Sequence, residues 1–140
     1  MRVLVDTSTW VDFLNDFPSP AADALAELLQ GDDDVCTCGI VVAEVFQGLH
    51  RDQGRDSIRR SFEDMIFLEP PGIRLYLRAA GLYRALRERG TSVRSTVDCI
   101  VAALAEDCGC DLLARDRDMD AILDSGLLKA GRWQPPASRG

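Results

Sequence analysis

Four acidic residues lie where the hydrophobic pattern of the chain would bury them. Each one ends, interrupts or opens an apolar run: Asp6, Glu44, Asp98 and Asp116. A buried carboxylate needs a cation, a hydrogen-bond donor or a proton, because an unpaired buried charge is strongly disfavoured. If the four converge, each pair about 4 Å apart repels by roughly 4 kcal/mol at an effective dielectric of 20, and the sequence offers no obvious counter-ion nearby. A divalent ion that prefers oxygen ligands, Mg²⁺ or Mn²⁺, would resolve this conflict.

Each of these acids also has a structural alternative. Asp6 and Asp116 follow apolar runs, and an aspartate at the end of a strand is often a turn residue. Glu44 could form a buried ion pair with an arginine. Asp98 stands at the fourth position of a capping box that begins at Ser95, where it could bond the backbone and favour the helix dipole. A carboxylate has two oxygens, so a cap and a metal ligand can be the same residue.

Three neighbouring side chains could support the acidic site. Ser8, two residues after Asp6, is placed to hydrogen-bond a ligating carboxylate, or simply to cap a helix. Asp118 and Asp120 follow Asp116 at alternate positions. Asp118 could serve as a further metal ligand or complement the first turn of a helix, and we expect Asp120 to do only the latter.

The elements that must position these residues alternate along the chain, which favours an α/β domain on a mostly parallel sheet. We expect strands at 2–6, 35–38, 66–69 and 111–114, with a last edge strand at 127–133. The expected helices are 8–15, 20–30, 40–52, 55–65, 73–89, 95–107 and 118–125. Ligands of such sheets bind beyond the carboxyl ends of the strands, so Asp6 and Asp116 meet if their strands are neighbours. The helix over 40–52 is apolar nearly all round, which predicts that it is buried and that Glu44 is buried with it.

Length and composition predict one domain. The chain has 140 residues, of which 46% are hydrophobic and 28% charged, and we assign the domain to 1–133 and a flexible tail to 134–140. No apolar run approaches the ~20 residues that span a bilayer, and a charge follows too early for a secretory signal, so we expect a cytoplasmic protein. The five cysteines lack zinc spacing and a disulfide framework, and we expect them to be small packed side chains.

The net charge of −7 weighs against a nucleic-acid partner, but the cations are unevenly placed. Fifteen of the sixteen are arginine, and ten of those lie between Arg51 and Arg94. Arginine suits phosphate contacts and stacking on bases, although a genome rich in G and C gives the same excess. We expect RNA contacts from Arg59, Arg60 and Arg94.

Four segments together resemble PIN-domain ribonucleases and, more narrowly, the VapC toxins of bacterial toxin-antitoxin pairs. The segments are 3–8, 42–45, 91–103 and 112–118, and the resemblance spans the whole domain. It implies a three-layer α/β/α sandwich, an Mg²⁺ or Mn²⁺ site on the four acids, and cleavage of single-stranded RNA to 5′-phosphate and 3′-hydroxyl ends. Two departures are Arg115, where the family often has Thr, Ser or Asn, and Met119, where an aromatic residue often follows.

The implied reaction is metal-assisted hydrolysis of an RNA phosphodiester, in which one or two ions activate water and stabilise developing charge. The implied partners are a VapB-type antitoxin that covers the groove beside the long helices, an RNA substrate and a second copy in a homodimer. One alternative is a PIN-like RNA- or protein-binding module without catalysis. A phosphotransferase with an acidic Mg²⁺ site is less favoured, because the haloacid dehalogenase type needs an acid where Ser8 stands.

Overall fold

The computed structural model describes residues 1–50, 52 and 54–136, over which helices and strands alternate as the sequence predicts. In chain order the elements are β1 (Arg2–Val5), α1 (Thr7–Leu14), α2 (Pro20–Gln30), β2 (Asp34–Cys38), α3 (Gly39–Gln47), α4 (Arg55–Glu63), β3 (Ile66–Leu68), α5 (Ile73–Glu88), α6 (Thr96–Asp107), β4 (Asp111–Leu113) and α7 (Arg117–Asp124).

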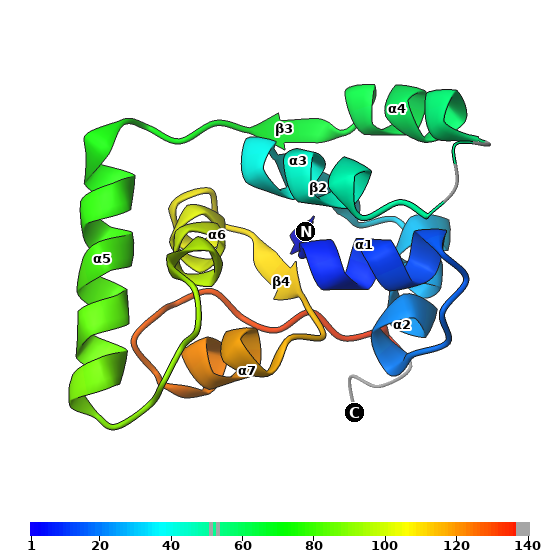
Figure 1. Ribbon diagram of the computed structural model, residues 1–140. Helices are drawn as coiled ribbons and strands as arrows, with labels where there is room; N and C mark the ends of the chain where they lie inside the picture. The colour runs from blue at the N-terminus through cyan, green and yellow to red at the C-terminus, as the bar shows by residue number, and fades with distance from the viewer. Residues whose placement is uncertain (51, 53, 137–140) are drawn as a thin grey trace.

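The four strands form one parallel sheet in the order β3-β2-β1-β4. β1 lies between β2 and β4, and Val5 is the register partner of Leu113. Figure 1 shows α6 beside the sheet, with α5 outside it, and α1 and α2 on the opposite side of the sheet. The predicted three-layer α/β/α sandwich is therefore confirmed.

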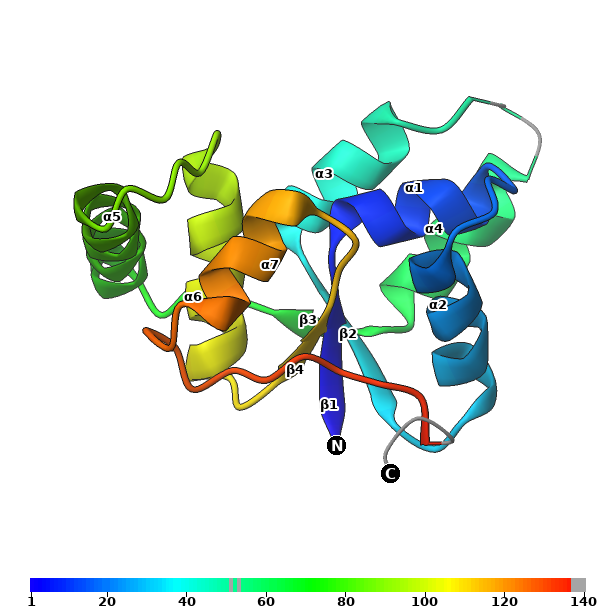
Figure 2. The ribbon, with the colours of Figure 1, turned by 90° about the horizontal axis from the view of Figure 1, so that it is seen from below.

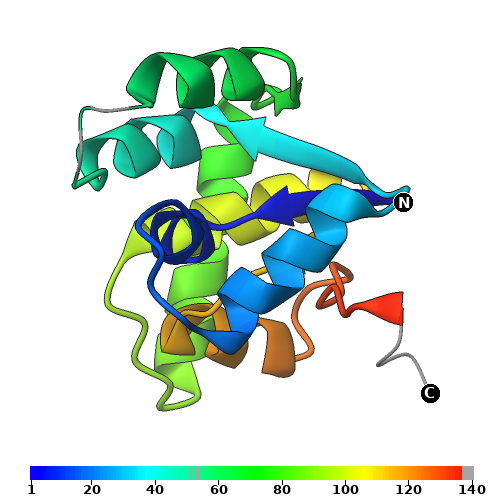
Figure 3. The ribbon, with the colours of Figure 1, turned by 90° about the vertical axis from the view of Figure 1, so that its right-hand side faces the viewer.

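The centre of the sheet is fully buried, because helices cover both faces. Val3, Leu4 and Val5 of β1 have no exposed surface. An aromatic cluster joins the helices on one edge: the ring of Phe62 lies 4.8 Å from that of Trp10 and 5.6 Å from that of Phe46. These ring contacts join α4 to α1 and α3. Figures 1 and 3 show α4 beside α3.

Helix α3 differs from the expectation in length and in burial. It ends at Gln47 rather than near Asp52, and Gly48 is its C-cap. Val41 and Val45, four residues apart, are its buried residues, whereas Glu44 is exposed. The prediction that Glu44 is buried was wrong, because the helix lies at the edge of the molecule and packs through one face although nearly all its residues are apolar.

The expected edge strand at 127–133 is also wrong, apart from one isolated bridge between Leu112 and Arg132. Two backbone hydrogen bonds fix this contact: Leu112 donates to Gly131 at 2.8 Å and Trp133 donates to Leu112 at 2.8 Å. The indole of Trp133 then donates to Asp33 at 3.0 Å. This segment runs beside β4 for too few residues to form a β-ladder. Of the expected tail, 137–140 lie outside the described residues.

The carboxyl ends of the strands gather the starts of several helices. Figure 2 shows β1 running from the N-terminus to α1, with α7 and α3 near the same end of the sheet. Asp6 is the single residue between β1 and α1, and Asp6 rather than Ser8 is the N-cap of α1. No helix among the described residues is long and apolar enough to cross a membrane.

Candidate metal centre

Three of the four predicted acids converge at this edge of the sheet. Asp6, Asp98 and Asp116 each offer a carboxylate oxygen, and these atoms lie within 4.8 Å of one another. Over residues 1–50, 52 and 54–136 no other group of three His, Cys, Asp or Glu side chains is as close. Three oxygen ligands so close together form a donor set that suits a hard divalent cation.

Each of the three carboxylates lies at the start of a helix. Asp6 is the N-cap of α1, Asp98 lies in the first turn of α6, and Asp116 is the N-cap of α7. Asp6 and Asp116 are brought together because β1 pairs with β4, and the backbone N–H of Asp6 donates to Leu113 at 2.9 Å. The strand-end argument from the sequence therefore predicted the correct neighbours.

Crowding and burial raise the proton affinity of this cluster. Burial is the main cause that raises the pKa of Asp6 to about 6, partly opposed by a hydrogen bond from the backbone of Thr7, while Asp116 and Glu44 add repulsion. The pKa of Asp98 rises to about 8, first through burial and then through the charges of Asp116 and Asp6. Without a cation, the site therefore holds a proton near neutral pH.

Glu44 lies at the rim rather than inside the cluster. Its side chain accepts a hydrogen bond from the hydroxyl of Thr7 at 2.9 Å, and its charge contributes to the raised pKa of Asp6. The two residues on each side of Glu44 are apolar, and they gave no sign of this exposed position. The group of three close carboxylates does not include Glu44.

The supporting residues have the following contacts. The hydroxyl of Ser8 donates to Oδ2 of Asp6 at 3.4 Å. Asp118 is buried, and one of its oxygens accepts hydrogen bonds from the backbone N–H of Arg94 at 3.1 Å and from Nε of Arg94 at 3.2 Å. Asp120 pairs with Arg132 at 3.1 Å, away from the cluster.

Arg94 is a counter-ion that the sequence did not suggest for this site. Nη2 of Arg94 lies 3.9 Å from Oδ1 of Asp116, in addition to the contacts with Asp118. The sequence offered no obvious counter-ion for the acids, because 24 residues separate Arg94 from Asp118 along the chain. The family motif over 91–103 was the only signal that could have pointed to it.

Arg59 and Arg60 lie on α4 among acids of the same helix. Arg59 lies 3.7 Å from Asp56 and 3.8 Å from Glu63, both exposed pairs. Arg60 donates to the backbone of Asp56 at 3.4 Å. The charge of this helix is thus largely balanced, and an RNA contact through these two arginines stays a prediction.

The cysteines are all free, and four of the five are buried. Among the described residues, no cysteine belongs to a group of three or more His, Cys, Asp or Glu side chains close enough to hold a metal ion. Cys36 and Cys38 alternate along β2 and both belong to the hydrophobic core. Their packing role matches the expectation from their spacing.

Comparison with known proteins places this chain in a family. A model of the PIN domain matches residues 3–123. The VapC ribonuclease Mb1587 of Mycobacterium bovis is 33% identical over 133 residues, covering 94% of this chain and 99% of that protein, and the ribonuclease VapC11 of Mycobacterium tuberculosis matches equally. The structure of VapBC-1 from nontypeable Haemophilus influenzae has a similar fold, with a TM-score of 0.67 at 20% identity over 96% of this chain and 97% of that one. The chain belongs to the PIN domain family and, within it, to the VapC ribonucleases.

Proposed function

We propose that this protein is a metal-dependent endoribonuclease toxin that hydrolyses phosphodiester bonds of single-stranded or loop RNA. The observation that carries the proposal is the group of three carboxylates whose oxygens lie within 4.8 Å at the carboxyl end of the sheet. Its relatives at 33% identity are ribonucleases by name, which supports RNA as the substrate. A cytoplasmic location follows from that substrate.

The residues present fit a divalent cation. Burial first, and then repulsion between the carboxylates, raises the pKa values of Asp6 and Asp98, and an ion with oxygen ligands would offset both effects. Asp6, Asp98 and Asp116 would hold Mg²⁺ or Mn²⁺, with Glu44 joining from the rim. When bound, such an ion supplies charge stabilisation and activates water for attack on a phosphodiester.

The chain itself orients the ligands and controls their protonation. Ser8 and the backbone of Thr7 fix the direction of the Asp6 carboxylate through their hydrogen bonds. Asp98 holds a proton at neutral pH in the absence of a cation, so metal binding must release that proton. We therefore expect metal affinity to rise with pH.

Two other functions fit the site less well. A module that binds RNA without cleaving it has no need for three converging carboxylates, two of them buried, and all four predicted acids are present. A phosphotransferase of the haloacid dehalogenase type needs an acid two residues after Asp6, where Ser8 instead donates a hydrogen bond to it.

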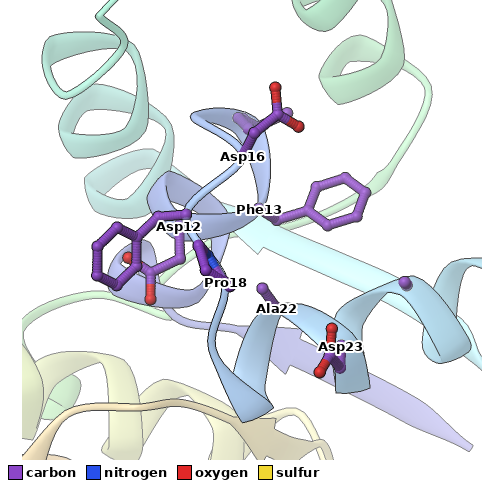
Figure 4. Close-up of a pocket in the computed structure, with 9 residues that line it drawn as sticks. Asp12, Phe13, Asp16, Pro18, Ala22 and Asp23 are labelled. Atoms are coloured by element: carbon purple, nitrogen blue, oxygen red, sulfur yellow. The ribbon is translucent and has the colours of Figure 1, made fainter.

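A VapB-type antitoxin is the proposed partner of the toxin. A hollow of about 450 Å³ lies between α1 and α2. Figure 4 shows Phe13 and Pro18 around it together with the carboxylates of Asp12, Asp16 and Asp23. Asp12 is buried and already paired with Arg115 at 2.8 Å. The apolar walls and the two exposed acids, Asp16 and Asp23, suit an antitoxin segment that carries both apolar and basic side chains. The solved VapBC-1 structure is of such a pair, and its fold resembles this chain.

A second copy is the other proposed partner. Large apolar side chains are exposed together near β3 and the start of α5: Phe67, Ile73, Tyr76 and Leu77 are 51%, 73%, 45% and 62% exposed. Exposed apolar patches of this kind mark interaction surfaces. We propose a homodimer that also binds antitoxin as a hetero-oligomer.

The decisive experiment is cleavage of RNA by the purified chain during titration with Mg²⁺ and Mn²⁺. We expect no cleavage in chelator, activity on adding either ion, and products with 5′-phosphate ends. Sequencing of the new 5′ ends would identify the RNA. Absence of metal-dependent cleavage, combined with Mn²⁺ binding that persists, would favour the non-catalytic module instead.

A further inference from the structure

A hydrogen-bonded chain links Arg94, Asp118 and Asp116 behind the three converging carboxylates. Both the backbone N–H and Nε of Arg94 donate to Oδ2 of Asp118, at 3.1 and 3.2 Å. The backbone N–H of Asp118 then donates to Oδ1 of Asp116 at 3.0 Å. The chain of contacts therefore ends on a carboxylate that the proposed metal site uses.

This chain of contacts crosses between two helix starts. Arg94 directly precedes Ser95, the N-cap of α6, whereas Asp118 lies in the first turn of α7. Asp98 is in the first turn of α6, and Asp116 is the N-cap of α7. The bonds between Arg94 and Asp118 consequently fix the distance between Asp98 and Asp116, which belong to different elements.

Burial makes Asp118 suited to this role. Asp118 is 5% exposed, and its Oδ2 accepts two hydrogen bonds from Arg94. The group of carboxylate oxygens within 4.8 Å includes Asp116 but not Asp118. Neither oxygen of Asp118, including Oδ1, which accepts no bond from Arg94, is close enough to the other ligand atoms to join that group.

The geometry points to Asp118 and Arg94 as a pair of positioning residues, which hold Asp116 in place for the metal rather than binding the metal themselves. This inference rests on the proposed metal site. Partners that orient a metal ligand change metal affinity by roughly 10- to 100-fold when they are removed. The effect should therefore be measurable in the absence of RNA.

The direction in which Arg94→Ala changes the Mn²⁺ affinity separates a positioning role from a purely electrostatic one. Removing a cation close to a metal site should strengthen Mn²⁺ binding if charge alone matters, because repulsion falls. If Arg94 positions Asp116 through Asp118, Arg94→Ala should instead weaken Mn²⁺ binding. Arg87→Ala is the matched control, because Arg87 is exposed on α5. This substitution removes the same charge at a different place.

The test is calorimetric titration of the full-length, metal-free protein with Mn²⁺, alongside its melting temperature. We expect Arg94→Ala and Asp118→Ala each to weaken binding about 10-fold, with the double variant no weaker than the worse single variant. Asp118→Asn keeps an oxygen that can accept from Arg94, so it should lose less affinity than Asp118→Ala. If Asp118→Ala fails to fold, the Mn²⁺ affinities of Asp118→Asn and Arg94→Ala still test the positioning role.

Three results would overturn the inference. Tighter Mn²⁺ binding by Arg94→Ala with weaker binding by Asp118→Asn would make Asp118 a direct ligand and Arg94 its competing cation. Unchanged affinity in every variant would reduce the contacts to packing, while the proposed function would survive because the wild type still binds. A wild type that binds no Mn²⁺ would overturn both.

Discussion

The hydroxyl of Thr7 donates a hydrogen bond to Oε1 of Glu44 at 2.9 Å, which joins the first turn of α1 to the exposed face of α3. Thr7 follows Asp6 directly, so this bond brings the charge of Glu44 to the edge of the cluster. The repulsion is large enough to contribute to the raised pKa of Asp6. An exposed carboxylate can therefore belong to the site without being buried.

Glu44→Gln should weaken Mn²⁺ binding and RNA cleavage together, by roughly 10-fold, while the melting temperature stays close to that of the wild type. The amide keeps the volume and the hydrogen bond from Thr7 but removes the charge, and exposure leaves little packing to lose. Titration with Mn²⁺ and thermal unfolding check both parts. A variant that unfolds while each folded molecule binds Mn²⁺ normally would instead make Glu44 a structural residue.

Asp98→Asn should abolish RNA cleavage and yet stabilise the metal-free protein at pH 8. Neutralising one of three crowded carboxylates removes repulsion, and the pKa of Asp98 of about 8 shows that its charged form is disfavoured. Asp6→Asn should behave in the same way with a smaller stabilisation. Cleavage assays and thermal unfolding in chelator provide the measurements, and cleavage at the wild-type rate would remove either residue from the site.

The metal-free protein should lose stability as the pH rises. Folding raises the pKa of Asp6 from 3.8 to about 6 and that of Asp98 from 3.8 to about 8. From the unfolded pKa of 3.8 up to the folded pKa of each group, the folded chain keeps a proton that the unfolded chain has released. The free energy of unfolding therefore falls with increasing pH over this range. The contribution of Asp98 is the difference in the free energy of unfolding between the wild type and Asp98→Asn, measured from pH 4 to 9. Saturating Mg²⁺ should remove the fall, whereas a difference independent of pH would contradict the raised pKa.

Replacing Cys36 and Cys38 with alanine should leave Mn²⁺ affinity unchanged and lower the melting temperature. Both thiols are buried in the core and neither belongs to the group of close carboxylates. Cys108→Ala is the control at a half-buried position. Metal analysis of the purified protein should find no stoichiometric zinc, and tightly bound zinc would refute this reading of the cysteines.

Arg84→Glu with Arg87→Glu should weaken RNA binding more than Arg59→Glu with Arg60→Glu does. Arg84 and Arg87 are exposed on α5, and no ion pair of theirs was found among the described residues, whereas Arg59 lies between Asp56 and Glu63. For single strands, each phosphate contact adds about 0.7 to the slope of log affinity against log salt. RNA affinity at several salt concentrations compares the two double variants. Equal slopes in both and in the wild type would take all four arginines out of the RNA path.

The sequence predicted the fold and the convergence of the strand-end acids, because both follow from local patterns. The apolar runs before Asp6 and Asp116 indicated strands, and the rule for parallel sheets brought their ends together. The exposure of Glu44 was not predictable in this way, since nearly uniform apolar neighbours do not reveal which face of α3 packs. The pairing of Arg94 with Asp118 depends on how the segment before α6 crosses α7, which no local pattern records.

The strand β1 ends at Val5 and the helix α1 begins at Thr7, so Asp6 alone forms the connection. One inserted residue on either side of it would turn the helix by roughly 100° against the sheet, because no loop exists to absorb the extra length. The segments 15–19 and 69–72, by contrast, lie between helices and strands and carry none of the three close carboxylates. Evolution of this chain by insertion and deletion is therefore restricted to such turns, and related chains should differ in length there while β1 and α1 stay one residue apart.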